Sequence, residues 1–406
     1  MAKEKTSKNY LSGKEIRAIS KANAKEMKRL EAYKKRRCDE SEFLSQMKNN
    51  QNILEIDDLH TFFFTEQGVV KAVNGVSYDV PKNAVVGVVG ESGCGKSVTS
   101  MSVMRLIQGP TGQIVDGSIR FKSKEYKLDS KGKPIPKAGT EGEYETEEKV
   151  YDIAKMPTRE IHRIRGKQVA MIFQEPMTSL NPVFTIGQQL DEVTLLHVPG
   201  ATKEMARAKS EEMLRLVGII PENVYKAFPH ELSGGMRQRV MIAMALAAEP
   251  RLIIADEPTT ALDVTIQAQI LDLLQVIKNK IDGSILLITH DLGVIAEMAD
   301  YVVVMYAGKV IEKGTVYEIF QDPRHPYTIG LQKSKPTMKL DDSTELYNIP
   351  GNVPNPINMP SHCYFKERCA MCAQNGKCSG DYPNMVQVSP THFVACHLYD
   401  EENING

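Results

Sequence analysis

The sequence predicts an α/β fold built around a mainly parallel sheet with helices on both faces. Short apolar segments rich in β-branched residues, typical of buried strands, occur at 84–89, 169–173, 252–255, 285–289 and 301–306. Stretches of helical periodicity lie between them at 203–217, 234–248 and 265–280. Strands that alternate with helices indicate parallel βαβ units. Of the 406 residues, 42% are hydrophobic, which is enough for a sizeable packed core.

The first 50 residues form a basic extension, with fourteen Lys or Arg against seven Asp or Glu. Ser12 and Glu15 have the spacing of a capping box, and apolar residues recur behind them at helical intervals. We therefore expect a helix over about 13–37. Two interpretations remain open: the helix binds anionic lipid or an acidic partner, or it is a solvated appendage.

Residues 51–320 are expected to form the main domain, which starts with short β-rich runs over 54–119. Residues 122–150 interrupt it with a charged stretch that is rich in Gly and Pro, which predicts an inserted surface loop or a disordered hairpin. Residues 321–406 are expected to form a C-terminal segment with a small cysteine-rich module, because five of the seven cysteines lie in the last 44 residues.

Charge and hydropathy exclude several classes of protein. Fifty basic and fifty-one acidic side chains leave a net charge of −1, without the basic excess that general nucleic-acid binding favours. No stretch approaches the roughly 20 apolar residues that cross a bilayer, so we expect no membrane span. The charged N-terminus has no apolar signal region, which predicts a cytoplasmic, reducing location and cysteines that are thiols or metal ligands.

A phosphate-binding loop is predicted at residues 90–97, GESGCGKS, between a strand at 84–89 and a helical run at 98–106. This context is the one that the motif G-x-x-x-x-G-K-[ST] requires. Glycines let backbone N–H groups curl around phosphates, Lys96 meets the β- and γ-phosphates, and Ser97 places a hydroxyl on Mg²⁺. The predicted contacts to the nucleoside triphosphate are Gly90, Ser92, Gly93, Cys94, Gly95, Lys96, Ser97 and Val98.

Two adjacent carboxylates, Asp256 and Glu257, follow the apolar strand at 252–255. Neighbouring residues at a strand end point to different sides, so the two can perform different tasks. Asp256 would hold Mg²⁺, and Glu257 would polarise the water that attacks the γ-phosphate. The alternative is a pair of solvated acids that begin a turn at Pro258.

The segment LSGGM at 232–236 precedes a helical run and predicts a second anion-binding helix end at Ser233, Gly234 and Gly235. A second phosphate site on such a chain favours a head-to-tail dimer. Here the sequence resembles the nucleotide-binding subunits of ABC transporters, whose signature is LSGGQ. Gln174 in FQEP resembles their Q-loop, Asp263 in the sequence Ala261-Leu262-Asp263 their D-loop, and His290 in ITHD their switch histidine.

This resemblance implies an ABC-type P-loop ATPase fold, with an antiparallel β subdomain and a helical subdomain beside the parallel sheet. It implies ATP and Mg²⁺ as cofactors, Gln174 with Ser97 and Asp256 near the metal, and a hydrogen bond from His290 to the γ-phosphate. An aromatic side chain should stack on adenine, for which Phe63 is the best candidate. The alternative is that Phe63 and its neighbours Phe62 and Phe64 are strand-core residues.

Longer segments resemble the ATP-binding subunits of oligopeptide and dipeptide importers, namely 171–189, 228–239, HPYT at 325–328 and IPGNVPNP at 349–356. The resemblance implies a peripheral protein on the cytoplasmic face of the membrane. Its partners would be two membrane-spanning permease subunits, a second related ATP-binding subunit in a heterodimer and, indirectly, an extracytoplasmic peptide-binding protein. The alternatives are an importer of nickel or a metal chelate and, from another class, a soluble ABC ATPase that acts on DNA or ribosomes; we expect no nucleic-acid partner.

The resemblance also implies an iron–sulfur cluster in the C-terminal segment. It maps the four ligands of a [4Fe–4S] cluster to Cys363, Cys369, Cys378 and Cys396, with Cys372 as an extra thiol that competes with Cys378. From chemistry alone, clustered thiols suit either an iron–sulfur cluster or Zn²⁺, because both take four thiolates, and free thiols remain a third possibility. Cys94 is interpreted as a small residue of the phosphate loop, or as a thiol whose alkylation would block nucleotide entry.

Overall fold

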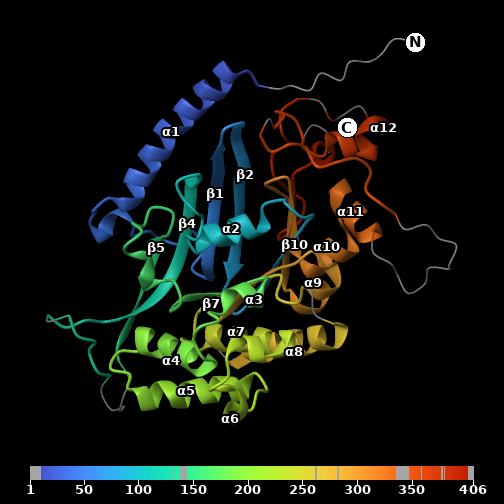
Figure 1. The fold of residues 1–406 in the computed structure, drawn as a ribbon. Helices are drawn as coiled ribbons and strands as arrows, with labels where there is room; N and C mark the ends of the chain where they lie inside the picture. Colours follow the sequence, from blue (N-terminus) through green and yellow to red (C-terminus); the bar gives the residue numbers. More distant parts are fainter. Residues whose placement is uncertain are drawn as a thin grey trace.

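The computed structural model describes residues 11–130, 132–137, 144–260, 263–280, 283–334, 347–357, 359–375, 378 and 380–400. In this part of the chain two sheets share one core, the helix Lys96–Val103 contacts strands of both sheets, and the other helices pack around them (Figure 1). The strands are β1 (Asn52–Thr65), β2 (Gly68–Pro81), β3 (Val85–Val89), β4 (Gly112–Tyr126), β5 (Thr146–Asp152), β6 (Val169–Ile172), β7 (Leu252–Asp256), β8 (Ser284–Ile288), β9 (Tyr301–Tyr306), β10 (Lys309–Thr315), β11 (Val386–Gln387) and β12 (Phe393–Val394).

The helices lie where the apolar periodicity changes from two to about 3.6 residues. They are α1 (Gly13–Lys35), α2 (Lys96–Val103), α3 (Pro176–Ser179), α4 (Ile186–His197), α5 (Lys203–Leu216), α6 (Pro221–Val224), α7 (Gly234–Leu246), α8 (Val264–Lys280), α9 (Leu292–Met298), α10 (Val316–Gln321), α11 (Pro326–Lys333) and α12 (Ala370–Asn375). The predicted helices and strands are confirmed with end points that shift by a few residues.

The larger sheet has the strand order β11-β12-β10-β9-β3-β8-β7-β6 among the described residues. Strands β9, β3, β8, β7 and β6 run parallel, and β10 turns back antiparallel to β9. Every residue of β3, β7 and β8 is buried, as expected for a sheet covered on both faces. Because these strands are parallel, the loops after β3, β7 and β8 open at one edge, where ligands bind in such folds.

The smaller, antiparallel sheet has the order β2-β1-β4-β5 within the described chain. The inserted stretch 122–150 continues the β4–β5 hairpin, with register pairs from Arg120↔Asp152 to Tyr126↔Thr146. Residues 131 and 138–143 of the insertion lie outside the described residues. The insertion is therefore a hairpin anchored on this sheet, and Gln168 fastens it by hydrogen bonds of 2.9 Å to both backbone groups of Lys124.

The N-terminal helix α1 begins at the predicted capping box, with Ser12 and Glu15 bonding reciprocally to each other's backbone N–H. It lies along the antiparallel sheet, shown in blue in Figure 1, and Asn23 donates a 2.8 Å hydrogen bond to the carbonyl of Thr65. After the helix, Phe43 is only 2% exposed and belongs to the core between the two sheets. The residues that follow the helix are therefore part of the core, while the two interpretations of the helix itself stay open.

Helices α4 to α8 form a layer at the bottom of Figure 1, on the opposite side of the molecule from the C-terminal segment. Buried side chains of α5, α7 and α8, such as Leu214, Ile242 and Leu274, join the core under the parallel sheet. Thr185 begins α4 through a capping box with Gln188, which sets the direction in which the chain leaves the loop after β6.

The C-terminal segment continues the larger sheet, because β12 pairs with β10 through Glu312↔Val394 and Lys313↔Phe393. A buried 2.8 Å contact between His392 Nε2 and Glu312 Oε1 reinforces this junction. The predicted separate cysteine-rich module is not supported, since its backbone and Cys396 are packed into the sheet and its core. Among the described helices, none is long and apolar enough to span a bilayer.

Candidate nucleotide-binding site

The phosphate loop follows β3 and ends where α2 begins at Lys96. Gly93 and Gly95 have φ values of 77° and 99°, a left-handed conformation that side chains disfavour. A Cβ atom on Gly95 would also lie 2.4 Å from the carbonyl oxygen of Ala72. The glycines are thus required by the turn, which directs backbone N–H groups and the N-terminus of α2 to the same place.

Lys96 is 5% exposed, and its Nζ donates to the carbonyl oxygens of Gly90 at 2.8 Å and Glu91 at 3.1 Å. The ammonium is therefore held at the mouth of the loop by carbonyl groups. Ser97 follows it, and its hydroxyl donates a 2.9 Å hydrogen bond to Oδ1 of Asp256. The loop thus joins the end of β7 through two of the predicted metal-binding side chains.

Asp256 is buried at the end of β7, and burial raises the pKa of its carboxyl group. The nearby charge of Glu257 also raises this pKa, whereas the Ser97 hydrogen bond lowers it. A buried carboxylate with an added like charge beside it favours a cation, because a cation offsets both costs.

Glu257 directs its carboxylate toward three polar side chains. It accepts hydrogen bonds from Gln174 Nε2 at 3.0 Å and from Thr260 Oγ1 at 2.9 Å, and Nδ1 of His290 lies 3.4 Å from Oε1. The backbone of Glu257 has a φ of 47°, and its N–H donates to the carbonyl of Ile288 in the neighbouring strand. This position holds the carboxylate where a general base would face a water molecule.

A cavity of about 530 Å³ contains most of the predicted nucleotide site, and its lining comes from five separate parts of the chain. The lining residues are Ala72, Ser92, Gly93, Gly95, Lys96, Ser97, Val98, Gln174, Glu257 and His290. The structure thus brings together the P-loop, Q-loop, catalytic glutamate and switch histidine predicted from sequence. Ala72 was missed, because a small strand residue carries no sequence signal.

Gly90, Cys94, Asp256 and Phe63 do not line this cavity in the described chain. Cys94 is 2% exposed, and burial raises the pKa of its thiol, so the structure favours the small-residue interpretation over a reactive thiol. Phe63 pairs with Gly112 in β4, and its ring lies beside the Gly112 backbone. Its role in stacking on adenine stays a prediction.

The LSGGM segment lies at a second, separate cavity of about 380 Å³ at the start of α7. Its lining residues are Ser233, Gly234, Gly235, Met236, Arg239, Asp263 and Ile266. Ser233 caps α7 by accepting from the N–H of Met236. Asp263 therefore joins the signature segment, whereas Ala261 and Leu262 of the D-loop lie outside the described residues.

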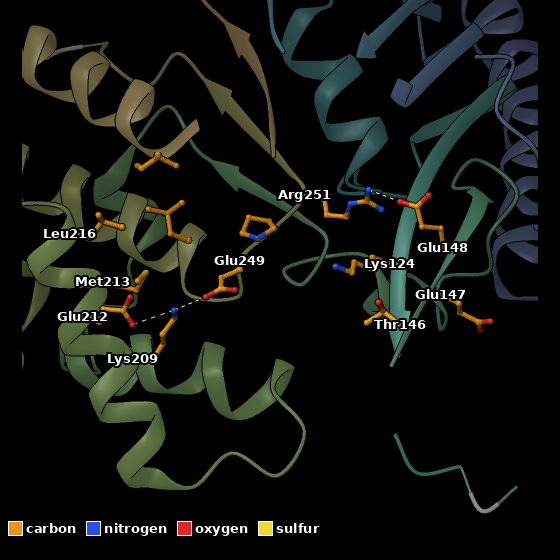
Figure 2. Close-up of a pocket in the computed structure, with 13 residues that line it drawn as sticks. Lys124, Thr146, Glu147, Glu148, Lys209, Glu212, Met213, Leu216, Glu249 and Arg251 are labelled. Atoms are coloured by element: carbon orange, nitrogen blue, oxygen red, sulfur yellow. Dashed lines mark hydrogen bonds and ion pairs between the residues drawn. The ribbon is translucent and has the colours of Figure 1, made fainter. Parts of the chain in front are cut away.

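A larger cleft of about 640 Å³ separates the inserted hairpin from the helical layer (Figure 2). Several of its charged side chains already form ion pairs: Lys209 lies 2.7 Å from Glu249 and 3.3 Å from Glu212, and Arg251 lies 2.8 Å from Glu148. The P-loop, Q-loop and switch residues do not line it. This cleft is therefore distinct from the nucleotide site.

The C-terminal cysteines are free thiols that are buried or half-buried, and the N–H of Cys372 donates a hydrogen bond of 3.2 Å to the carbonyl of Cys369. Burial raises the pKa of Cys396 to about 12, and the charges of Cys363 and Cys369 act in the same direction. Burial likewise raises the pKa of Cys378 to about 12, together with a hydrogen bond and repulsion from Cys372. Within the described residues, no three His, Cys, Asp or Glu side chains are grouped so as to hold one metal ion.

A phosphate loop, a carboxylate pair at the end of another parallel strand of the same sheet and a separate helix that begins at the LSGGM segment are the features of an ATP-hydrolysing nucleotide-binding cassette. Residues 73–260 match the ABC transporter family, and residues 311–378 match the family of the oligopeptide/dipeptide transporter C-terminal region. The chain belongs to the ATP-binding proteins of this transporter family, and it is an ABC ATPase.

Two relatives from Bacillus subtilis (strain 168) support this membership along most of the chain. The oligopeptide transport ATP-binding protein AppD is 46% identical over 352 residues, which cover 86% of this chain and 98% of AppD. The dipeptide transport ATP-binding protein DppD is 45% identical over 352 residues, which cover 86% of this chain and 96% of DppD.

Solved structures confirm the fold. The dimeric ATP-binding cassette MJ0796, bound to ADP and phosphate, superposes with a TM-score of 0.52 at 22% identity and covers 65% of this chain and 98% of its own. The cassette cbiO1 from Clostridium perfringens gives a TM-score of 0.51 at 23% identity and covers 70% and 96%.

Three polar contacts around the site were not predicted from sequence. Thr260 donates a hydrogen bond to the Glu257 carboxylate, and Gln238 of α7 donates a hydrogen bond of 2.7 Å to the carbonyl of Pro258. Tyr327, in the HPYT segment, accepts a 2.8 Å hydrogen bond from the N–H of Glu91 in the phosphate loop. Gln238 and Tyr327 lie in segments that carried the family resemblance, 228–239 and 325–328, but the resemblance assigned no role to either residue.

Proposed function

We propose that this chain is the ATP-hydrolysing subunit that energises an importer of oligopeptides or dipeptides at the cytoplasmic face of a membrane. The proposal rests mainly on one observation: the P-loop, Gln174, Glu257 and His290 line the same cavity. Family membership, and the names of the two relatives, support peptides as the cargo.

In this proposal Lys96 binds the β- and γ-phosphates, and Ser97, Asp256 and Gln174 hold Mg²⁺. The metal would neutralise charge that develops on the phosphates. Glu257 accepts a proton from the attacking water, and His290, already beside Glu257, donates to the γ-phosphate. Phe63 is proposed to stack on adenine.

The two separate cavities support a head-to-tail dimer. Ser233, Gly234, Gly235 and Asp263 face a cavity that is distinct from the phosphate loop of the same chain. A second subunit would bring its own signature segment to this phosphate loop and receive the one described here. We propose a related but different ATP-binding subunit as that partner, forming a heterodimer.

Exposed apolar side chains beyond the Q-loop support docking of the two membrane-spanning permease subunits. Val183 is 74% exposed and Phe184 is 50% exposed, and both lie between Gln174 and α4. Neighbouring exposed apolar residues of this kind are typical of interaction surfaces. Movement of Gln174 with the nucleotide would thus reach the permease, to which an extracytoplasmic binding protein delivers peptides.

A [4Fe–4S] cluster held by Cys363, Cys369, Cys378 and Cys396 is a further part of the proposal. Burial, and secondly repulsion between neighbouring thiolates, raises the pKa values of these thiols, and bound iron would offset both costs. Thiolates on a cluster bind different iron atoms, so they need not converge as ligands of a single Zn²⁺ ion do. The bound cluster would supply a structural cross-link.

Anaerobic purification tests the cluster. We expect a brown protein with about four irons per chain and a shoulder near ~400 nm, as clusters held by four thiolates give. Cys363→Ser should bleach it, whereas Cys372→Ser should leave it intact. A colourless protein that contains zinc, or bleaching by Cys372→Ser with Cys378→Ser silent, contradicts this assignment.

The transport function is tested by reconstituting the chain with its co-purifying permease subunits and binding protein in vesicles. Peptides should stimulate ATP hydrolysis and accumulate inside, and Lys96→Ala should abolish both through loss of ATP binding. Stimulation by nickel chelates without any effect of peptides would replace the peptide assignment and leave the ATPase assignment intact.

A further inference from the structure

Arg368 connects the cysteine segment to the phosphate loop. It ends a short helical turn, Lys366–Arg368, and its side chain is only 5% exposed. Nη1 lies 2.8 Å from Oε2 of Glu91, and Nη2 lies 3.0 Å from Oε1. This is a two-bond fork between a guanidinium and a carboxylate, which fixes orientation as well as charge.

The other donors of Arg368 are also used. Nε donates a hydrogen bond of 2.9 Å to the carbonyl of Pro350. Nη1 and Nη2 donate longer hydrogen bonds of 3.4 Å to Tyr306 Oη and to the carbonyl of Ile349, respectively. All five N–H groups of the guanidinium therefore have partners. The Glu91 hydrogen bonds are the largest cause of a raised Arg368 pKa, so the group stays charged.

Glu91 is the second residue of the phosphate loop, and it is held on three sides. Its carboxylate accepts hydrogen bonds from Arg368, and its N–H donates a hydrogen bond of 2.8 Å to Tyr327 Oη. Its carbonyl accepts a hydrogen bond of 3.1 Å from Lys96 Nζ. A shift of the Glu91 side chain would move its peptide groups and therefore the carbonyl that positions Lys96.

We propose that Arg368 is a positioning residue of the nucleotide site, which sets the affinity for ATP by clamping Glu91. The inference rests on the proposed role of Lys96 as the phosphate-binding group. Its distinctive claim is that a residue of the C-terminal cysteine segment, 277 positions away from Glu91, belongs to the support of the phosphate loop.

The turn that presents Arg368 is anchored between two cysteines. The N–H of Lys366 donates a hydrogen bond of 3.1 Å to the carbonyl of Cys363, and the N–H of Cys369 donates one of 3.2 Å to the carbonyl of Lys366. A change of backbone at these cysteines would therefore reach Arg368 directly. The C-terminal segment then acts on ATP binding rather than serving only as packing.

The test measures KM and kcat for MgATP, and the Kd of MgATP by calorimetry, in the assembled transporter with Arg368→Gln. We expect KM and Kd to rise about tenfold, equivalent to about 1.4 kcal/mol, with kcat within about twofold of wild type. Arg368→Lys should restore part of the affinity, because it keeps the charge and loses the fork.

Arg120→Gln is the matched control, since Arg120 is a 14% exposed arginine paired with Glu55 and Asp57 in the antiparallel sheet. It removes a similar ion pair and should leave the MgATP affinity unchanged. Thermal unfolding of each variant confirms that a folded protein is measured.

Glu91→Gln keeps the test decisive if Arg368→Gln does not fold. It should raise the Kd for MgATP by a similar factor, and the double variant should be no worse than the single ones, since both act through one contact. An unchanged Kd in folded Arg368→Gln or Glu91→Gln, or additive effects, would overturn the proposal. Lys96→Ala tests the nucleotide site separately: normal MgATP binding there would refute the site itself.

Discussion

Glu257 shows how single residues determine the chemistry at this site. Hydrogen bonds from Gln174 and Thr260 orient its carboxylate. The amide in Glu257→Gln has nearly the same shape as the carboxylate, but it cannot accept the proton of the attacking water. We expect ATP hydrolysis to fall at least about 100-fold while ATP still binds, so that ATP-bound dimers accumulate in size-exclusion chromatography. Glu297→Gln, an exposed site on α9, is the control. Near-normal hydrolysis by Glu257→Gln would reassign the base.

Asp256 illustrates the cost of a functional carboxylate. Its pKa is raised by burial, so its ionised form lowers the stability of the metal-free protein as pH rises through that pKa. We expect Asp256→Asn to raise Tm in EDTA by about 1–2 °C at pH 7 while hydrolysis is lost. The difference in Tm should vanish below about pH 3.9, where both side chains are neutral. A lower Tm for Asp256→Asn at pH 7 would contradict this account.

At the scale of elements, the segment after α1 is part of the folded core. Phe43 is buried against Tyr151 with ring centroids 5.7 Å apart, whereas its neighbour Leu44 is 43% exposed. We expect Phe43→Ala to lower the free energy of unfolding by about 3–5 kcal/mol in urea titrations. Leu44→Ala should change it by about 0.5 kcal/mol or less. Equal small effects would contradict the placement of Phe43 in the core.

At the scale of the whole molecule, the separation of the phosphate loop from the proposed anion-binding start of α7 predicts a defect that acts in trans. Ser233→Arg places a long cation at the start of α7, where the partner's ATP would bind. In a heterodimer with one labelled nucleotide site, we expect hydrolysis at the partner's phosphate loop to fall about 10-fold or more. Loss confined to this chain's own phosphate loop would exclude the head-to-tail arrangement.

Much of the fold, and the grouping of the proposed catalytic residues around one cavity, could be predicted because their signals are local. Strand β9 and helix α5 are readable from apolar periodicity within one element. The phosphate loop needs glycines at fixed offsets before Lys96, and Asp256 and Glu257 follow directly after a strand. Parallel strands then bring such loops to one edge, so the motif order along the chain already implied the cavity.

Only the tertiary structure decided which distant segments support that cavity. Phe43 lies in a charged stretch whose composition suggested solvent, yet β5 and the core between the sheets cover it. The cysteine count suggested a separate module, but backbone pairing of β12 with β10 joins it to the main sheet. The Arg368–Glu91 contact spans 277 positions, and no periodicity or spacing encodes such a pair. Local patterns thus determined the nucleotide chemistry, while long-range packing decided what holds the phosphate loop, because side-chain partners depend on how the chain returns to itself.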